Sequence, residues 1–371
     1  MQVSELNALT TQILAAAFLL SLAFGFITQR THFCTMGAIG DVVNMGDWTR
    51  MRQWGLAIGV AMIGFAVLAY TGLIDASKTI HASNRWFWLS ATVGGALFGF
   101  GMVLASGCGN KTLVRVGSGN LKSLIVMLVL GLSAFATLKG ITAVLRVETV
   151  DLVVVDFPTV ANLPHLFAAA LSLNPVLVSL VMGVLIGGGL VVWALMGPEF
   201  CQVDNLLSGL GIGAIIVAMW WVSGHLGYLA EHPETLSETF LATNSGRAEA
   251  LSFVAPVAYT LDLLMFFSDK SKVLTMGIVS VLGVILGSTI SALVTRSFRW
   301  EGFGSTEDVG NHLVGAVLMG VGGVTAMGCT VGQGLTGIST LGLTSFVALF
   351  SIIAGAVAAF KYQVWRIEQM A

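Results

Sequence analysis

Charged residues are scarce in this chain. Asp, Glu, Lys and Arg together make up 10% of its 371 residues, whereas soluble proteins average about 25%. The 17 Lys and Arg nearly balance the 19 Asp and Glu, and they are scattered without forming a basic stripe. The sequence also lacks a Gly-rich phosphate loop of the Walker type. These absences exclude a nucleic-acid-binding protein and an ATPase.

Cysteine is also rare. The chain has four, no two of them have CxxC spacing, and each lies within or beside an apolar stretch. A secreted disulfide framework and a structural zinc site both need closer and more regular cysteine spacing. We therefore expect free thiols, with no metal site and no cofactor.

Long apolar stretches make up much of the chain. Hydrophobic residues make up 56% of the chain, its mean hydropathy is +0.90, and several stretches approach the ~20 residues that cross a bilayer. We predict an all-α integral membrane protein with about nine or ten transmembrane helices plus short re-entrant or broken helices. The candidate spans are residues 12–29, 54–73, 86–106, 121–138, 175–196, 206–222, 253–267, 273–293, 312–327 and 343–360.

The charged loops predict the orientation. No Lys or Arg precedes residues 12–29, so we expect a retained helix there and not a cleaved signal peptide. Basic residues follow the first and third spans, whereas residues 225–249 hold four glutamates. By the positive-inside rule the N-terminus lies outside. Lys270 and Lys272 then fall inside, but Lys361 and Arg366 fall outside on an even span count, a conflict that favours one crossing fewer.

The four cysteines form two matched pairs. Cys34 and Cys201 each follow a Phe just after an apolar stretch, and Cys108 and Cys329 each follow a Gly at the end of a Gly-rich apolar segment. The order Phe-Cys then Gly-Cys, occurring twice, predicts a two-fold internal repeat. We divide the chain into residues 1–150, a linker at 151–174 that suits a surface-lying amphipathic helix, and 175–371 with a polar insertion near 223–249.

Buried thiols suit contact with a passing anion. Hydrocarbon surroundings disfavour the thiolate, so Cys34, Cys108 and Cys329 should be neutral S–H groups, which are weak donors. Weak multiple contacts are what a conduction path needs, and Cys201 is a fourth candidate for contact with the substrate. Helices broken at Gly107-Cys108 and Gly328-Cys329 would add free backbone N–H groups and positive helix ends.

Polar residues flank both Gly-Cys pairs. Lys111 and Arg115 share a helical face with Cys108 if that segment is helical. Neutral hydrogen-bonding side chains are supplied by Asn110, Thr112, Thr330 and Gln333. The alternatives stay open here: a buried cysteine also packs as a small hydrophobe, and Lys111 and Arg115 also serve as topology determinants.

Three motifs resemble the YeeE/YedE family of bacterial sulfur-compound transporters. They are the run from Gly94-Gly95 through Gly107-Cys108 to Gly119, the segment Gln29-Arg30-Thr-His-Phe33-Cys34, and the run from Gly315 to Gly328-Cys329-Thr-Val-Gly332. The resemblance implies an all-helical inner-membrane protein that imports thiosulfate, with Cys34, Cys108 and Cys329 lining a central path. It also implies a partner, a small cytoplasmic sulfurtransferase of the TusA type.

The leading hypothesis is therefore a permease for a small sulfur anion, most simply thiosulfate, and not an enzyme. A carrier of selenium compounds or polysulfide with the same fold is an alternative. Another is a membrane sulfurtransferase in which one cysteine holds a persulfide, activated by Lys111. Copper transport through Met102, Met327 and Cys329 ranks last, because no further soft ligands cluster with them.

Overall fold

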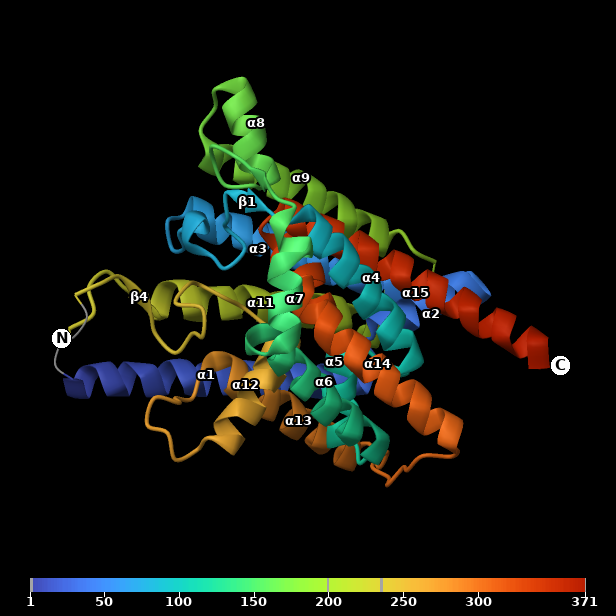
Figure 1. Ribbon diagram of the computed structural model, residues 1–371. Helices are drawn as coiled ribbons and strands as arrows, with labels where there is room; N and C mark the ends of the chain where they lie inside the picture. Colours follow the sequence, from blue (N-terminus) through green and yellow to red (C-terminus); the bar gives the residue numbers. More distant parts are fainter. Residues whose placement is uncertain (1–2, 199, 234–235, 371) are drawn as a thin grey trace.

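The chain folds as a helical bundle with very little sheet. The computed structural model describes residues 3–198, 200–233 and 236–370. Its strands, in the described residues, form two short antiparallel pairs: β1 (Arg85–Trp86) with β2 (Val155–Asp156), and β3 (Tyr228–Leu229) with β4 (Thr239–Phe240). The predicted all-α membrane class is confirmed (Figure 1).

The helices follow the apolar stretches of the sequence. In chain order they are α1 (Val3–Thr31), α2 (Thr35–Met45), α3 (Thr49–Tyr70), η1 (Ala76–Lys78), α4 (Trp88–Leu104), α5 (Gly109–Gly117), α6 (Leu121–Lys139), α7 (Ile141–Glu148), η2 (Val150–Leu152), α8 (Leu163–Leu171), α9 (Pro175–Leu195), α10 (Val203–Leu206), η3 (Leu207–Gly211), α11 (Ile212–Trp221), η4 (Val222–Leu226), α12 (Val254–Met265), α13 (Met276–Val294), α14 (Thr306–Thr325), η5 (Gly332–Gly337) and α15 (Leu343–Met370). Each of the ten predicted spans coincides with one of them.

Eight helical segments within the described residues are long and apolar enough to cross a membrane. The other two predicted spans are α14, whose first turn carries Glu307 and Asp308, and α12, which has only 12 residues. At a rise of about 1.5 Å per residue α12 is roughly 18 Å long, well short of the ~30 Å hydrocarbon core. It therefore enters the bundle without crossing it.

The predicted position of Lys270 and Lys272 is wrong, because α12 does not cross the membrane. The Met276 amide, which begins α13, donates a 2.8 Å hydrogen bond to the Ala242 carbonyl, so the loop that follows α12 lies beside the loop that precedes it. We call this end of the bundle, where α1 begins, the N side. The two lysines lie there, and not across the membrane from α1's start as predicted.

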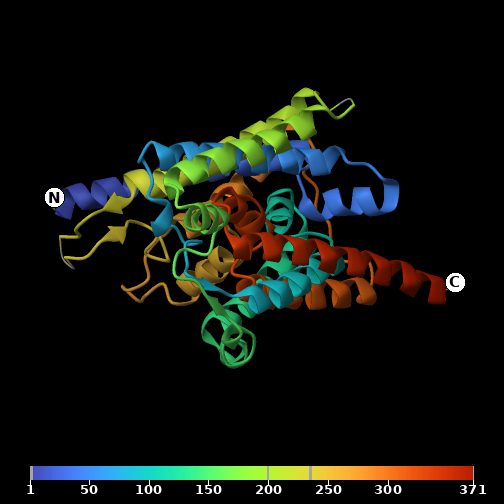
Figure 2. The ribbon, with the colours of Figure 1, turned by 90° about the horizontal axis from the view of Figure 1, so that it is seen from above.

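The opposite end of the bundle, where α15 ends, is the C side. Figure 2 shows the start of α1 and the end of α15 at opposite ends of the molecule. Lys361 and Arg366 near the end of α15 therefore lie on the same side as Arg30 at the end of α1. Without α12 the predicted crossings number nine instead of ten. An odd number places Lys361 and Arg366 on the opposite side of the membrane from the N-terminus, as the positive-inside rule requires.

The two Gly-Cys segments pack against each other in antiparallel directions. A side chain at Gly94 in α4 would collide with the backbone at Ala326, just after α14, and one at Gly101 would collide with the Gly315 carbonyl. Likewise Gly322 faces the backbone of Phe98. Small residues let two membrane helices approach this closely. The two segments thus run in opposite directions, with the end of α4 beside Gly315 and the end of α14 beside Gly94.

Candidate functional site

Three of the four cysteines begin a helix in the same way. In each case the residue two positions earlier has a left-handed backbone: His32 (φ 53°), Ser106 (φ 55°) and Met327 (φ 58°). This conformation is uncommon for residues other than glycine, and it ends the preceding helix. The chain then turns, and the cysteine stands at the start of the next helix. Both α4 and α14 are broken at the predicted Gly-Cys positions.

Two of the cysteine sulfurs cap the helices that follow them. Cys34 Sγ accepts a hydrogen bond from the Gly37 amide at 3.4 Å, and Cys329 Sγ accepts one from the Gly332 amide at 3.4 Å. Cys108 occupies the N-cap position of α5. Ser, Thr, Asp and Asn usually fill such positions, where the positive end of the helix dipole and free N–H groups lie. Three helix N-termini are thereby each associated with a thiol.

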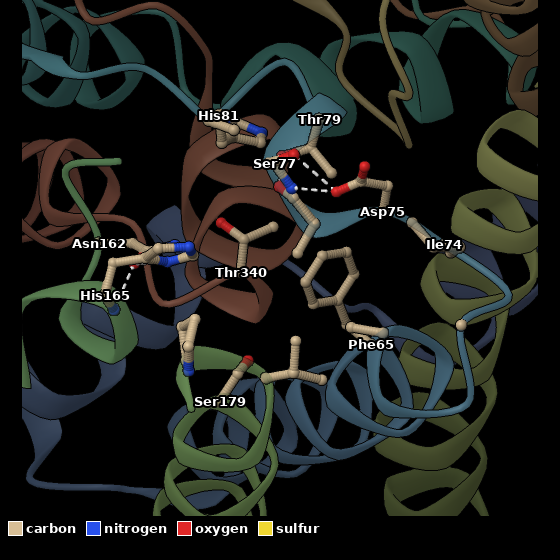
Figure 3. A pocket seen from close by; sticks show the side chains of 16 residues that line it. Phe65, Ile74, Asp75, Ser77, Thr79, His81, Asn162, His165, Ser179 and Thr340 are labelled. Carbon is tan, nitrogen blue, oxygen red and sulfur yellow. Dashed lines mark hydrogen bonds between the residues drawn. The ribbon is translucent and has the colours of Figure 1, made fainter. Parts of the chain in front are cut away.

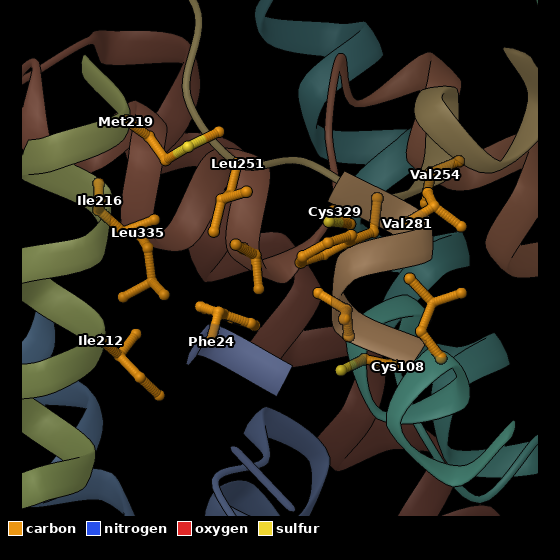
Figure 4. Close-up of a cluster of buried hydrophobic side chains, with 14 of the residues drawn as sticks. Phe24, Cys108, Ile212, Ile216, Met219, Leu251, Val254, Val281, Cys329 and Leu335 are labelled. Atoms are coloured by element: carbon orange, nitrogen blue, oxygen red, sulfur yellow. The ribbon is translucent and has the colours of Figure 1, made fainter. Parts of the chain in front are cut away.

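Two of these thiols lie next to each other, and the third belongs to the same buried cluster as one of them. The thiols of Cys34 and Cys108 lie close enough to interact electrostatically, and the Thr330 side chain, directly after Cys329, lies near the Cys108 thiol. Their exposed fractions are 4% for Cys34, 1% for Cys108 and 0% for Cys329. Figure 4 shows Cys108 and Cys329 in the same buried cluster as Val281 of α13. The contacts connect the two Gly-Cys turns with the end of α1.

The fourth cysteine does not join this group. Cys201 is exposed, and its Sγ lies 3.8 Å from the Leu195 carbonyl oxygen at the end of α9. Its neighbour Phe200 packs in a small separate cluster with Leu56 and Ala194. The pairing of Cys201 with Cys34 in the sequence therefore does not place the two in equivalent surroundings.

Basic side chains surround the C-side end of the thiol group. Lys111 lies near both Cys34 and Cys108, and its charge also interacts with that of Arg50. Arg50 forms an ion pair with Asp41 (3.2 Å), and a side chain at Gly37 beside Cys34 would collide with its guanidinium. Arg50 is one of the basic residues after the first predicted span, which the sequence analysis used only for orientation. Its approach to Cys34 could not be predicted, because it requires α3 to fold back along α2.

The remaining polar candidates hold the broken helix ends. Arg115 Nη1 donates to the Ser106 carbonyl at 2.7 Å. Gln333 Nε2 donates to the carbonyls of Ala326 (2.9 Å) and Met327 (3.0 Å), while its Oε1 accepts from Ser345 (2.6 Å). Each turn is thus closed by a side chain from the helix that follows it.

Four further candidates line these same turns. The Thr112 hydroxyl donates to the Cys108 carbonyl at 3.0 Å, and Asn110 is 1% exposed with no hydrogen-bond partner for Oδ1 among the described residues. Gly107 faces the Lys111 side chain and Gly328 faces that of Gln333. Asn110 is the second residue of α5, and its Oδ1 is an acceptor without a hydrogen-bond donor close to Cys108.

A cavity of about 360 Å³ on the N side reaches the second Gly-Cys turn. We call it the N-side cavity. Met327, Gly328 and Gln333 form one part of its wall, and His81 and Glu249 form another. A neighbouring cavity of about 300 Å³ shares His81 and also contains His165 and Asn162 (Figure 3). The sequence singled out neither His81 nor Glu249 as site residues, because both lie in loops without a motif.

The described residues contain no group of three or more His, Cys, Asp or Glu side chains placed to hold a metal ion. The described site residues are instead thiols, amides and hydroxyls, with cations at one end.

This arrangement can be compared with known proteins. The sequence model of the sulphur transport family matches residues 30–358, from the last turn of α1 to α15. The chain belongs to the sulphur transport family. The match includes all four cysteines and both broken helices, and the resemblance to YeeE/YedE proteins is confirmed.

Two relatives match along most of the chain. A thiosulfate transporter, TsuA, from Spirochaeta thermophila is 27% identical over 343 residues, covering 91% of this chain and 95% of the relative. The TsuA protein of Escherichia coli is 27% identical over 342 residues, covering 89% of each. A probable transporter, YedE, of Escherichia coli is 31% identical over 114 residues, which is 31% of this chain and 27% of the relative. The family and these relatives identify a multi-pass membrane protein that transports a sulfur anion.

Proposed function

We propose that this protein is a permease that imports thiosulfate across the bacterial inner membrane, from the N-side cavity to the C side. The ion would pass Cys329, Cys108 and Cys34 in that order. The observation that carries this proposal is that the buried Cys108 thiol lies near both the Cys34 thiol and the side chain of Thr330, which directly follows Cys329.

The chemistry of the route suits thiosulfate. Neutral S–H groups donate weak hydrogen bonds to an anion and make good contacts with its polarisable terminal sulfur. Three helix N-termini add partial positive charge without adding a fixed cation at every step. Binding is then weak and distributed, so an ion can both enter and leave. The relatives named as thiosulfate transporters, aligned over about nine tenths of this chain, support the same substrate.

The charges support the direction. Lys111, Arg115 and Arg50 gather at the C-side end of the route. Arg30, Arg52 and Lys122 lie on the same side, so the positive-inside rule favours the C side as the cytoplasm and the N-terminus as periplasmic. The positive charges at the C-side end of the route attract the anion from the thiols toward the cytoplasm. We expect a TusA-type sulfurtransferase to receive the ion in the cytoplasm.

The thiols are buried, so side chains around them must move for an ion to pass. No covalent step is required, since contact alone transfers the ion from one thiol to the next. The alternative in which one cysteine takes the sulfane sulfur as a persulfide would make the protein an enzyme. A carrier of polysulfide or a selenium compound would use the same contacts with a different ion.

The experiment is uptake of radiolabelled thiosulfate into cells that lack other uptake routes. Cells expressing the wild type should accumulate label, and Cys108→Ala and Cys329→Ala should reduce uptake to the background. Cys201→Ala is the matched control, since it removes a thiol outside the route, and should behave as the wild type. Sulfate, selenite and polysulfide serve as competitors. Absence of thiosulfate uptake by the wild type, with uptake of a competitor, would overturn the substrate assignment.

A further inference from the structure

The N-side cavity contains a carboxylate that an anion route should avoid. Glu249 lies in its wall, together with Met327, Gly328 and Gln333 of the second Gly-Cys turn. An ion in this cavity would therefore share it with the Glu249 side chain next to the turn that precedes Cys329. Two negative charges in a confined, partly desolvated space repel each other strongly.

No cation in the described residues neutralises Glu249 by an ion pair. Its Oε2 accepts a 2.9 Å hydrogen bond from the Ser245 hydroxyl, its Oε1 lies 3.4 Å from the Asn244 amide, and its own amide donates to the Ser223 hydroxyl at 3.1 Å. These neutral contacts fix the position of the side chain without supplying positive charge.

The cations nearest to the cavity are engaged elsewhere. Arg146 of α7 pairs with Asp151 at 3.0 Å, and Arg85 of β1 pairs with Asp156 at 3.4 Å. Arg247, two residues before Glu249, donates to the carbonyls of Thr79 (3.3 Å) and Ala82 (2.6 Å). Each guanidinium facing this region therefore already has its own acceptor.

Two other titratable groups line the same cavity. Burial lowers the pKa of His81 to about 4, so this imidazole is neutral throughout the range from pH 5.5 to 8. Tyr259 of α12 also lines the cavity, and Asp262, three residues further along α12, is paired with Lys272. The parts of α13, α14, η5 and α15 that line the cavity contribute no titratable side chain.

We propose that Glu249 is a proton-binding site that controls entry to the route: its carboxyl group must take up a proton before the sulfur anion can occupy the N-side cavity. The inference rests on the proposed function, since it assigns a step to the same route. Protonation turns Glu249 from a repelling charge into a hydroxyl donor facing the incoming anion. The proton comes from the solution on the N side.

The electrostatic setting supports uptake near neutral pH. Burial raises the pKa of Glu249 to about 7, and the hydrogen bonds from Ser245 and Asn244 oppose that rise. Below this pH the carboxyl group is mostly neutral and the cavity accepts an anion. Above it the carboxylate forms, and binding of an anion must then be accompanied by proton uptake.

The test is calorimetric titration of the purified full-length protein with thiosulfate at pH 8, in buffers of different ionisation enthalpy. The buffer dependence of the heat counts the protons taken up per ion bound. The wild type should take up about one proton per ion. Glu249→Gln, which is permanently neutral, should bind thiosulfate with no proton uptake and with an affinity that no longer falls between pH 6 and pH 8.

Two further variants separate this role from a structural one. Glu238→Gln removes a carboxylate from the same loop that is paired with Lys78 at 2.6 Å, and should titrate as the wild type does. Ser245→Ala removes a hydrogen bond that holds the Glu249 pKa down, and should move the pH dependence of binding to higher pH.

The outcomes distinguish this inference from the proposed function. Thiosulfate binding by the wild type without proton uptake, or an unchanged proton count in Glu249→Gln, would overturn the role of Glu249 and leave the thiosulfate route standing. Absence of both binding and uptake of thiosulfate by the wild type would overturn the proposed function, and this inference with it.

Discussion

The Arg115 guanidinium donates a 2.7 Å hydrogen bond to the carbonyl oxygen of Ser106. This bond joins α5 to the end of α4 across the turn that holds Cys108. Ser106 has a left-handed backbone (φ 55°), so the bond stabilises a conformation that a serine seldom adopts.

Loss of this bond should weaken the first broken helix. We expect Arg115→Met to lower the free energy of unfolding by about 1.5–3 kcal/mol, the usual contribution of a hydrogen bond from a charged group. Thermal unfolding in detergent measures the change. Arg115→Lys keeps the charge but loses the planar guanidinium and should recover only part of the stability. Unchanged stability in both variants would show that the turn forms without this bond.

Lys111 should act on the ion more than on the fold. Its ammonium group lies near the thiols of Cys34 and Cys108, where it attracts an anion leaving the neutral part of the route. We expect Lys111→Met to raise the half-saturating thiosulfate concentration roughly 10-fold, equivalent to about 1.4 kcal/mol. Lys111→Arg should stay close to the wild type.

The matched control for that charge is Lys122. It lies on the same side of the membrane but is paired with Asp308 at 2.8 Å. Uptake measured over a range of thiosulfate concentrations should leave Lys122→Met unaffected. An equal effect of both substitutions would point to topology or general surface charge instead of a contact with the ion.

The interface between α4 and α14 should have no room for a larger side chain in place of its glycines. A methyl group at Gly322 would collide with the Phe98 backbone, so Gly322→Ala should destabilise the protein by about 1–3 kcal/mol, as overpacking does. Gly189 in α9 is exposed, with no atom near the position of a Cβ, and Gly189→Ala should be neutral or slightly stabilising. The retained monodisperse fraction after heating in detergent compares the two variants.

The four thiols should differ in reactivity. Cys201 is exposed, whereas Cys34, Cys108 and Cys329 are buried. A small maleimide should modify about one thiol per chain rapidly in the folded protein, since access and thiolate formation both favour the exposed site. Mass spectrometry should show all four modified after unfolding. Rapid labelling that persists in Cys201→Ala would contradict the closed packing of the other three.

The sequence revealed the parts of the site that are local. Gly107-Cys108 and Gly328-Cys329 marked the broken helices, because a glycine-rich apolar run that ends in a polar turn has few other structures in a membrane. The same reasoning could not reveal the left-handed backbone at Ser106 and Met327, since neither residue type favours it.

Tertiary packing decided the rest. The contact of Arg50 with the Cys34 turn and the position of Glu249 in the N-side cavity depend on how separate segments fold together. The topology of α12 depended on its length, because residues 253–267 look apolar enough to cross but only 12 of them are helical. Cys201 followed the sequence pattern of Cys34 and yet lies outside the thiol group.

The most direct test of a thiol-lined route for an intact anion uses thiosulfate labelled separately at its two sulfur atoms. Proteoliposomes containing the purified protein are given either the sulfane-labelled or the sulfonate-labelled ion, and the label inside is measured against time. Passage of the intact ion predicts equal uptake of the two labels by the wild type, and loss of both in Cys108→Ala. Accumulation or protein attachment of the sulfane label alone would contradict it, because the thiosulfate S–S bond would then have been cleaved at a cysteine.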